Sequence, residues 1–437
     1  MEVLLIVFFL LFFALLGSPL FAVIGAGALI ALSFAQTDTA IAVVELYRIT
    51  DQSVLIAIPL YTFAGYLLAE SHTPQRLVNL SRALFGWLPG GLAIVVLVSC
   101  AIFTAFTGAS GVTIVALGGL LYPALIQEKY PEKFSLGLVT TSGSLGLLFP
   151  PSLPLILYGM VASLVSVQSG FHSIVSVNQL FVAGILPGFL LVAALSLYSI
   201  RTGIGSGMTR TPFSWSNVRS STRAAAWEIP LPFIIVGGIY SGLFTAIEAA
   251  AVTAFYVFVV EVMIYRDLTF NWDVPRVMKE SMLLVGAIIL IIGSALGLTN
   301  YLIIEEIPQR LFEIIQAYVS SKAIFLILLN LFLLIVGMMM DIFSAIIVVV
   351  PLIVPVARNF GVDPVHLGII FLTNLEIGYL TPPVGLNLFI SSFRFEKPIA
   401  RVALSTLPYI AILFASLLVI TYVPELSLWL IRFFGVS

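Results

Sequence analysis

The sequence predicts an all-α polytopic membrane protein made of two inverted repeats, each with one re-entrant helical hairpin and one broken transmembrane helix. Three observations support this prediction. Hydrophobic residues make up 60% of the 437 residues and charged residues only 9%, whereas soluble domains carry about 25% charged residues. A long segment of the first half recurs in the second half. Helix-breaking residues stand in the middle of two apolar segments.

Composition limits the class of protein before any single motif does. A helix needs about 20 apolar residues to cross the hydrocarbon core of a bilayer, and apolar runs of that length recur from Val3 to the C-terminus. The single cysteine, Cys100, excludes an intrachain disulfide. No stretch matches the nucleotide-binding pattern G-x-x-x-x-G-K-[ST]. Any work that the protein performs must therefore draw on an ion gradient or on another subunit.

An internal repeat relates the two halves of the chain. Residues 122–152 align without a gap with residues 354–384, so that two Pro-Pro pairs coincide. Residues 66–77 resemble 301–311, with an identical Pro-Gln-Arg-Leu in each. A fainter match, in the same order along the chain, relates two further segments: 18–28 and 241–251. Chance rarely produces three matches in one order, so we predict two copies of one structural unit.

The distribution of positive charge predicts how the repeats lie in the membrane. We place the first repeat at 1–200 and the second at 229–437, joined by a polar linker at 201–228 whose arginines locate it in the cytoplasm. If 3–34 and 229–264 each cross the membrane and return, most Lys and Arg residues are cytoplasmic and each repeat crosses an odd number of times. The second repeat is then inverted and the N-terminus is periplasmic. If each segment crosses only once, the charge bias is weaker.

Short apolar arms predict the two hairpins. Around the sequence TGASG, two arms of about 15 residues would each reach about 22 Å. That is too short to cross, so a re-entrant hairpin is expected over about 91–126. Its counterpart covers about 322–358, with its tip at GMMMDIF, 337–343. Each hairpin precedes a predicted broken helix, over about 134–167 and about 364–393.

The breaks themselves release polar backbone groups. SGSLGLLFPPSLP, 142–154, interrupts the first predicted broken helix, and NLEIGYLTPPVGLN, 374–387, interrupts the second. Non-helical backbone at membrane depth leaves N–H and C=O groups that protein, water or ions must satisfy. Carbonyls released by Gly143, Ser144 and Gly146, together with nearby hydroxyls, are hard oxygen ligands of the kind that bind alkali cations. We therefore expect a cation site at each break. The alternative is that the breaks are packing kinks.

A second kind of ligand is expected beside each cation site. Proline suits the first position of a helix, whose N-terminus carries partial positive charge, and Ser152 or Thr381 stands nearby, so an anion fits there. Asp341 at the second tip marks an ion path, because an acidic group deep in an apolar run is costly. The alternative for Asp341 is a carboxylate that is paired with a hydroxyl or points outwards. Glu376 belongs either to an ion site or to an interface between domains.

Other polar residues are expected to be structural. Two amphipathic segments, 66–77 and 301–311, are expected to lie at the membrane surface and to support the part of the protein that moves. Glu248 makes a helix–helix hydrogen bond, and Trp215 and Trp227 anchor the linker at the membrane interface. The histidines are expected in loops or at helix ends, exposed to solvent: His72, His172 and His366.

At these residues the chain resembles the large membrane (M) subunit of TRAP transporters, the tripartite ATP-independent periplasmic transporters. The resemblance covers almost the whole length. It is carried by five segments: DQSVLIAIPLYTFAGYLL (51–68), FTGASGVTIVALGGLLYPAL (106–125), SGSLGLLFPPSLPLILYG (142–159), MDIFSAIIVVVPLIVPVA (340–357) and LEIGYLTPPVGLNLF (375–389).

The resemblance implies a transporter and not an enzyme. It implies a sodium symporter that imports a small organic anion, such as sialic acid or a C4-dicarboxylate, across the bacterial inner membrane. It also implies an elevator mechanism like that of other ion transporter superfamily carriers, in which two hairpins and two broken helices slide against a scaffold. Na⁺ is the implied coupling ion, with two or more per cycle, and no organic cofactor is implied. The implied partners are a small membrane subunit of about four helices, expected as a separate chain, and a periplasmic substrate-binding protein.

The resemblance also implies where these ligands bind. One sodium site would lie between the first tip and the first break, another between the second tip and the second break, and the substrate between the two breaks. The first sodium site is implied for Gly108, Ser110, Ser142, Gly143, Ser144 and Gly146. The second is implied for Asp341, Thr373, Asn374 and Gly378. The substrate is implied near Ser110, Ser144, Pro150, Ser152, Thr381 and Pro382.

Two other functions compete with this interpretation. A stand-alone divalent-anion/sodium symporter of related fold would need no binding protein, and an ion channel would conduct without a carrier cycle. A membrane enzyme is not favoured, because the sequence contains no recognisable nucleophile–base pair or metal cluster.

Overall fold

The computed structural model describes most of the chain. The described residues are 12–13, 18–48, 53–88, 90–168, 175–205, 212–241, 243–319 and 321–435. Within these ranges the regular structure is helical, without strands, which confirms the predicted all-α class. The predictions of a periplasmic N-terminus and of a solvated His172 concern positions outside the described residues, as does part of the predicted linker, 206–211.

The helices follow one another with short connections. In the first half they are α2 (Leu20–Phe34), α3 (Ala40–Arg48), the 3₁₀ turn η2 (Ser53–Ile56), α4 (Ala57–Glu70), α5 (Thr73–Phe85), α6 (Gly91–Thr107), α7 (Ser110–Ala116), α8 (Gly118–Gln127), α9 (Glu132–Ser142), the 3₁₀ turn η3 (Leu145–Leu148), α10 (Leu153–Gln168) and α11 (Val177–Gly205). In the second half they are α12 (Trp215–Ala224), α13 (Pro230–Tyr240), α14 (Ala246–Phe258), the π-helical turn η4 (Val259–Ile264), α15 (Asp273–Ile304), α16 (Ile307–Tyr318), α17 (Lys322–Met339), α18 (Ile342–Asn359), α19 (Pro364–Gly378), α20 (Leu386–Phe395), α21 (Ile399–Tyr422) and α22 (Glu425–Phe434).

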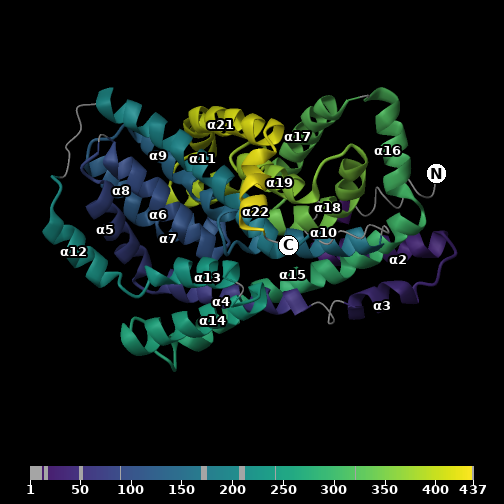
Figure 1. The fold of residues 1–437 in the computed structure, drawn as a ribbon, viewed down its shortest axis with the longest axis horizontal. Helices are drawn as coiled ribbons and strands as arrows, with labels where there is room; N and C mark the ends of the chain where they lie inside the picture. The colour runs from purple at the N-terminus through teal and green to yellow at the C-terminus, as the bar shows by residue number, and fades with distance from the viewer. Residues whose placement is uncertain are drawn as a thin grey trace.

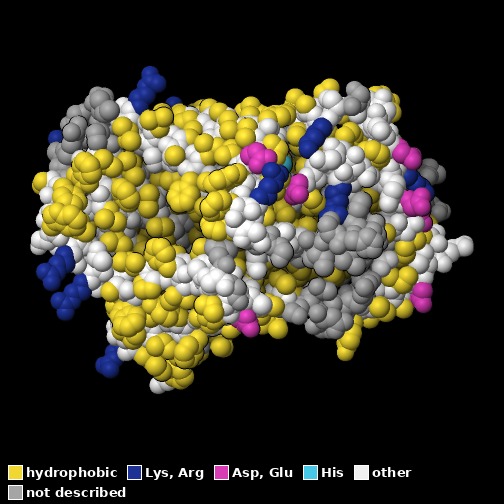
Figure 2. Space-filling model, viewed as in Figure 1, with side chains coloured by type: hydrophobic (Ala, Val, Ile, Leu, Met, Phe, Trp, Pro, Cys, Tyr) yellow, Lys and Arg dark blue, Asp and Glu magenta, His cyan; other side chains and the backbone are white. Residues whose placement is uncertain are grey.

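Long apolar helices make this a multi-pass membrane protein. Among the described residues, six helices are long and apolar enough to cross a bilayer, or nine if each of three bent helix pairs is one span. Apolar side chains cover much of the outside, as Figure 2 shows for one face. On α17 the exposed side chains include Leu328, Leu331 and Phe332. Such a surface is compatible with lipid, whereas soluble proteins rarely expose large apolar patches.

One layer of the molecule combines helices from both halves of the chain. The 32-residue helix α15 packs along α2, α3 and α4. Helix α14 packs along α4. Figure 1 shows these helices running together along one side of the molecule. Each half of the chain therefore covers helix faces of the other half.

The remaining helices surround two interrupted segments. Helix α6 joins α7 at residues 108–109, and α17 joins α18 at residues 340–341. Helices α9 and α10 stand on either side of η3, and α19 and α20 on either side of residues 379–385. Helix α17 packs on α19, α10 on α18, α6 on η3 and α7 on α20. The helices thus stop and restart inside the two Pro-rich segments, surrounded by other helices.

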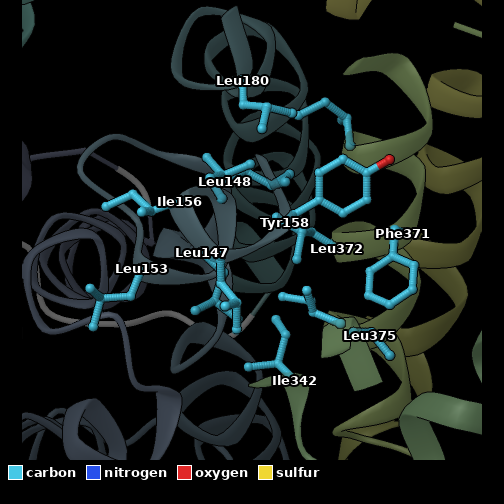
Figure 3. Packing of buried hydrophobic residues seen from close by; sticks show 14 of the residues in the cluster. Leu147, Leu148, Leu153, Ile156, Tyr158, Leu180, Ile342, Phe371, Leu372 and Leu375 are labelled. Atoms are coloured by element: carbon cyan, nitrogen blue, oxygen red, sulfur yellow. The ribbon is translucent and has the colours of Figure 1, made fainter. Parts of the chain in front are cut away.

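A shared apolar core joins the two interrupted segments. Figure 3 shows Leu147 and Leu148 of η3 and Tyr158 of α10 facing Phe371 and Leu372 of α19. The rings of Tyr158 and Phe371 lie 6.0 Å apart, and all five side chains are at most 1% exposed. Inside a bilayer this packing contributes by dispersion and close fit more than by removal from water. The two segments are therefore held as one unit.

A buried charge cluster ties α5 to the second half of the chain. The Arg76 guanidinium pairs with Glu228, with Glu261 at 3.0 Å and with Asp267 at 2.8 Å. These carboxylates are 4%, 0% and 11% exposed respectively. Burial by itself raises the pKa of Asp267, but the His72 backbone N–H and the Arg76 guanidinium outweigh it and hold that pKa below its ordinary value. The cluster fixes the α4–α5 corner against the linker and the loop after η4.

Two polar residues differ from expectation. His366 is buried and not solvated: its Nδ1 lies 3.1 Å from Ser427 Oγ and its Nε2 3.3 Å from the Thr421 carbonyl oxygen. The reason is that α21 and α22 pack against α19. Glu248 is exposed and caps its own helix, accepting hydrogen bonds from the N–H and hydroxyl of Thr245. The prediction of a helix–helix hydrogen bond by Glu248 is therefore wrong.

Candidate functional site

The first half of the site begins where α6 gives way to α7. Gly108 ends α6 with φ +65° and lies against Leu153 at the start of α10. Ser110, the first residue of α7, is 4% exposed. Thr104, one turn before the tip, donates from Oγ1 to the Gly143 carbonyl oxygen at 2.9 Å. The tip, the start of α10 and the first break are therefore in direct contact.

Gly146 places the first break directly on the backbone of α6. A Cβ atom on Gly146 would stand 2.3 Å from the Ala101 carbonyl oxygen and 2.4 Å from the Ala105 amide nitrogen. No larger residue fits, so glycine is required for η3 to approach α6 this closely. The break is consequently a close-packed contact as well as an interruption of a helix.

The backbone oxygens of the first break already have donors within the protein. The Gly143 carbonyl accepts from Thr104 at 2.9 Å. The Ser144 carbonyl accepts from the next turn of backbone at 3.0 Å, and so does the Gly146 carbonyl. A carbonyl oxygen has two lone pairs, so each can take a cation as a second partner. The carbonyls expected from the helix breakers are thus present, but they are shared with the protein's own N–H and O–H groups.

Buried hydroxyls without protein partners mark the places in the first half where a ligand fits best. Thr107 Oγ1, Thr141 Oγ1 and Ser152 Oγ are buried and have no hydrogen-bond partner among the described residues. Ser142 and Ser144 instead donate to carbonyls of their own turn, at 3.1 and 3.3 Å. A buried polar group without a partner costs about 1–3 kcal/mol, which a bound cation offsets. Sequence reasoning did not single out Thr107 and Thr141, although they stand at the edges of the quoted tip and break.

Asp341 caps α18 at the tip of the second predicted hairpin. Its carboxylate accepts the Phe343 N–H at 3.0 Å, the Ser344 N–H at 3.1 Å and the Ser344 hydroxyl. The neighbouring Ile342 N–H donates to the Tyr379 hydroxyl at 2.5 Å, which connects the tip to the second break. Asp341 is exposed and accepts from the Ser344 hydroxyl, which matches the alternative prediction of a carboxylate that is paired with a hydroxyl or points outwards. Two carboxylate oxygens offer about four lone-pair sites, so Asp341 can bind a cation while it caps the helix.

Gly378 and Asn374 both face α17, the first arm of the second predicted hairpin. A Cβ atom on Gly378 would stand 2.4 Å from the carbonyl carbon of Gly337, so the two helices touch backbone to backbone. Asn374 Nδ2 donates to Asn330 Oδ1 at 2.8 Å. Asn374 Oδ1 is buried and has no partner among the described residues. The Thr373 hydroxyl, by contrast, donates at 2.7 Å to a carbonyl of its own helix.

The two breaks differ in exposure at the residues expected near the substrate. Pro150 and Ser152 in the first break are buried. In the second break Thr381 is half-buried and Pro382 is exposed. Thr381 Oγ1 donates to the Ile377 carbonyl at 2.9 Å. The region between the breaks is therefore more accessible from the side of the second break.

Asn387 joins the two halves of the site. Its Oδ1 accepts from the Ser110 hydroxyl at 2.8 Å, and its Nδ2 donates to the Thr140 carbonyl at 3.5 Å. Its backbone N–H donates to the Tyr379 carbonyl at 3.1 Å. One buried residue thus contacts the first tip, the first broken helix and the second break. Sequence reasoning missed this role, although Asn387 is the last residue of the quoted second break and a polar residue at the start of an apolar helix.

Glu376 is a fully buried carboxyl group on α19. Neither of its carboxyl oxygens has a hydrogen-bond partner among the described residues. An ionised carboxylate without a counter-charge or donors would cost several kcal/mol in such a place. The group is therefore stable there when it is neutral or when a cation binds beside it.

Oxygen donors dominate this part of the molecule. Hydroxyl, amide, carbonyl and carboxylate oxygens approach the tips and breaks, and the described parts of the chain contain no group of three or more His, Cys, Asp or Glu side chains arranged to hold a metal ion. Ligands of this kind suit hard cations. The arrangement therefore fits binding of alkali cations next to a polar solute.

Comparison with known proteins finds relatives along the whole chain. Residues 4–426 match the family model described as "Tripartite ATP-independent periplasmic transporter, DctM component". A C4-dicarboxylate TRAP transporter large permease protein from Rhodobacter capsulatus is 35% identical over 441 residues, covering 100% of both chains. An ectoine/5-hydroxyectoine TRAP transporter large permease protein from Ruegeria pomeroyi is 30% identical over 422 residues, covering 95% of both.

One solved structure shares the fold at low sequence identity. The YdaH transporter of Alcanivorax borkumensis superimposes with a TM-score of 0.60 and 16% sequence identity, over 88% of this chain and 85% of that one. At this identity the likeness concerns the fold alone. It supports a helical membrane architecture with the same general path of the chain.

Proposed function

Because the chain belongs to the DctM family of TRAP transporters, we propose that it is the large permease subunit of a sodium-coupled, binding-protein-dependent importer of a small organic anion. The observation that carries this proposal beyond family membership is the pair of interrupted helices, each in contact with a hairpin tip and bridged by Asn387. The oxygen donors supply cation sites. The helix starts after each break supply partial positive charge for a carboxylate.

We assign one sodium ion to each half of the site. In the first half the unpaired Thr107 and Thr141 hydroxyls support a cation beside Ser110, where Ser142, Gly143, Ser144 and Gly146 form the break. In the second half the Asp341 carboxylate supports another at the tip, beside the contact between α17 and Gly378, while the unpaired Asn374 Oδ1 lies farther along α17, next to Asn330. The substrate lies between the breaks, near Ser152 and Thr381, with Pro150 and Pro382 at the helix starts. Two or more sodium ions then accompany each substrate.

Reciprocal packing supports inverted repeats and an elevator mechanism. In the sequence repeat, α14 is the counterpart of α2, and α15 is the counterpart of α4. In the structure α2 packs on α15 and α14 packs on α4. Exchanging the two halves converts one contact into the other, as expected for a two-fold axis, and the charge distribution favours an axis in the membrane plane. We propose that this layer is the scaffold against which the hairpins and broken helices slide.

Family membership supports the partners and the location. A TRAP large permease works with a small membrane subunit and a periplasmic binding protein, so these are the proposed partners and a bacterial inner membrane is the proposed location. The named relatives handle a C4-dicarboxylate and ectoine, so the proposed substrate class is a small carboxylate-bearing solute, with sialic acid as a further example. The choice among these solutes is assigned mainly to the binding protein.

Uptake measurements distinguish this proposal from its two rivals. In proteoliposomes holding both membrane subunits, labelled succinate, ectoine and sialic acid are offered with and without the cognate binding protein, in a sodium gradient or in choline. Uptake of one solute is expected only with the binding protein and sodium together. Full uptake without the binding protein would favour a stand-alone symporter. Unitary currents in a planar bilayer would favour a channel.

The sodium assignment at the second tip predicts a selective effect of Asp341→Asn. Asparagine caps helices as well as aspartate does, so the fold should be kept while the charge is lost. In wild type, sodium replacing choline at constant ionic strength should raise the midpoint of thermal unfolding, since a hundredfold excess over Kd stabilises by about 2.7 kcal/mol. Asp341→Asn should lose most of this rise.

A matched control exists on the neighbouring helix. Asp363 caps α19 through the Val365 and His366 N–H groups, at 2.8 and 3.2 Å. Asp363→Asn should therefore keep the full sodium response. Equal responses in wild type and Asp341→Asn would contradict the assignment of a sodium ion to Asp341.

A further inference from the structure

A polar groove lies between α5 and the linker helix α12, at a different place from the two breaks. It encloses about 230 Å³, and its polar lining includes Asn79, Arg82, Ser214, Asn217 and Ser221. None of the residues that line it is acidic. Ser214 is also the N-cap of α12, so the positive end of a helix opens into the same space. The groove therefore favours an anion.

Arg82 provides the charge and has unused donors. Its Nε atom is buried and has no hydrogen-bond partner among the described residues. Its terminal nitrogen forms an ion pair with the Glu128 carboxylate at 3.8 Å, a separation beyond hydrogen-bond distance. A guanidinium presents five N–H donors in a planar fork that matches a phosphate group. A phosphate in the groove would engage the Nε donor, which has no partner among the described residues.

Aromatic side chains form one border of the groove. Trp87 and Phe213 line it and meet edge to face, with ring centroids 6.2 Å apart. The Phe213 ring also meets the Trp215 ring edge to face, with ring centroids 5.3 Å apart. Trp87 and Trp215 are 47% and 76% exposed. Exposed tryptophans of membrane proteins concentrate at the level of the lipid headgroups. An inorganic ion would use only the polar wall, whereas a lipid also covers the aromatic border.

We propose that this groove binds the phosphate of an anionic phospholipid from the cytoplasmic leaflet. Figure 2 shows Lys and Arg side chains over the region of α12 labelled in Figure 1, as expected where a helix meets an anionic surface. Helix α12 packs on α5, and α5 packs on α6, the first arm of the first hairpin. A bound lipid therefore links the linker helix to the base of that hairpin. The proposal depends on the proposed function only for the cytoplasmic position of α12.

The test compares lipids, free phosphate and matched arginine variants. Wild type, Arg82→Gln and Arg223→Gln are purified in the same detergent and given phosphatidylglycerol, phosphatidylcholine or inorganic phosphate at constant ionic strength. Arg223 is exposed on α12 and does not line the groove, so its variant removes the same charge from the same region. Retained lipid is counted by native mass spectrometry, and stability is followed by thermal unfolding.

Phosphatidylglycerol should raise the unfolding midpoint of wild type and Arg223→Gln more than phosphatidylcholine does. Arg82→Gln should lose at least half of that difference and one retained lipid. A second variant, Ser221→Leu, fills the groove without removing charge and should show the same loss. Equal responses in wild type and both groove variants would overturn the proposal, and so would an equal response to inorganic phosphate alone. These readouts do not involve uptake, so they remain decisive even if the proposed transport function fails.

Discussion

Replacing Arg76 by methionine is expected to destabilise the folded protein by about 3–5 kcal/mol, because the substitution leaves buried carboxylates without their cation. Arg76 is the cation shared by Glu228, Glu261 and Asp267, and it also lies 3.9 Å from the centre of the Tyr265 ring. Methionine replaces the volume of the side chain but none of its donors. Thermal or denaturant unfolding in detergent, followed by tryptophan fluorescence, measures the loss.

A neighbouring arginine provides the control. Arg276 also joins the two halves of the chain, through Glu70 at 2.9 Å, but its side chain is 51% exposed. Exposed ion pairs contribute about 0–1 kcal/mol, so Arg276→Met should be nearly neutral. Adding Glu261→Gln to Arg76→Met removes one uncompensated charge and should restore part of the stability. Equal losses for Arg76→Met and Arg276→Met would contradict the assignment of this cluster as a buried charge network.

The contribution of Asp267 to the pH dependence of stability should differ between the two proteins. Burial alone raises the pKa of Asp267, but the His72 N–H and Arg76 hold it below its ordinary value in the wild type. Its contribution to stability is therefore present above its unfolded pKa and is lost as pH falls through the acidic range. Without Arg76, protonation of the buried carboxylates relieves their mutual repulsion. The stability difference between wild type and Arg76→Met should therefore shrink at low pH.

The sequence predicts the position of the breaks well because their cause is local. Glycine, proline and serine clustered within a few residues favour the end of a helix, whereas single prolines such as Pro187 and Pro408 stay inside helices. Helices α9 and α19 do end at Ser142 and Gly378. The tips are local for the same reason: Gly108 ends α6, and Asp341 starts α18. Such features can be predicted from the residues of one short segment alone.

Contacts between segments that are distant in the sequence could not be predicted from local residue chemistry. Asn387 meets Ser110 only because α20 packs on α7, and nothing within either segment specifies that pairing. His366 was expected in solvent because its partners, Thr421 and Ser427, belong to helices that follow much later in the chain. The sequence also predicted a released carbonyl at Gly146. It did not predict the N–H group that donates to this carbonyl, because that hydrogen bond depends on the geometry of η3.

Gly378→Val is the second substitution for which we expect a large effect, because it acts where α17 touches the second break. Even a single Cβ atom on Gly378 would stand 2.4 Å from the carbonyl carbon of Gly337, and backbone cannot yield as a flexible side chain can. Overpacking of this kind costs about 1–3 kcal/mol or more. We expect a graded loss of stability from glycine to alanine to valine, measured by thermal unfolding.

The same substitution should reduce the sodium response, which separates a functional effect from simple destabilisation. Forcing α17 away from α19 displaces two hydrogen bonds that hold the tip: the Ile342 N–H to Tyr379, at 2.5 Å, and the Gly385 N–H to the Met338 carbonyl, at 3.2 Å. The Asp341 carboxylate would then be displaced from the proposed cation site. Gly286→Ala on α15 is the control, because a Cβ atom there has nothing within 4 Å and alanine favours a helix by about 1 kcal/mol over glycine. That variant should keep or gain stability and keep the sodium response. A Gly378→Ala variant with unchanged stability and an unchanged sodium response would show that hairpin and break do not touch in the protein, and the second cation site would have to lie elsewhere.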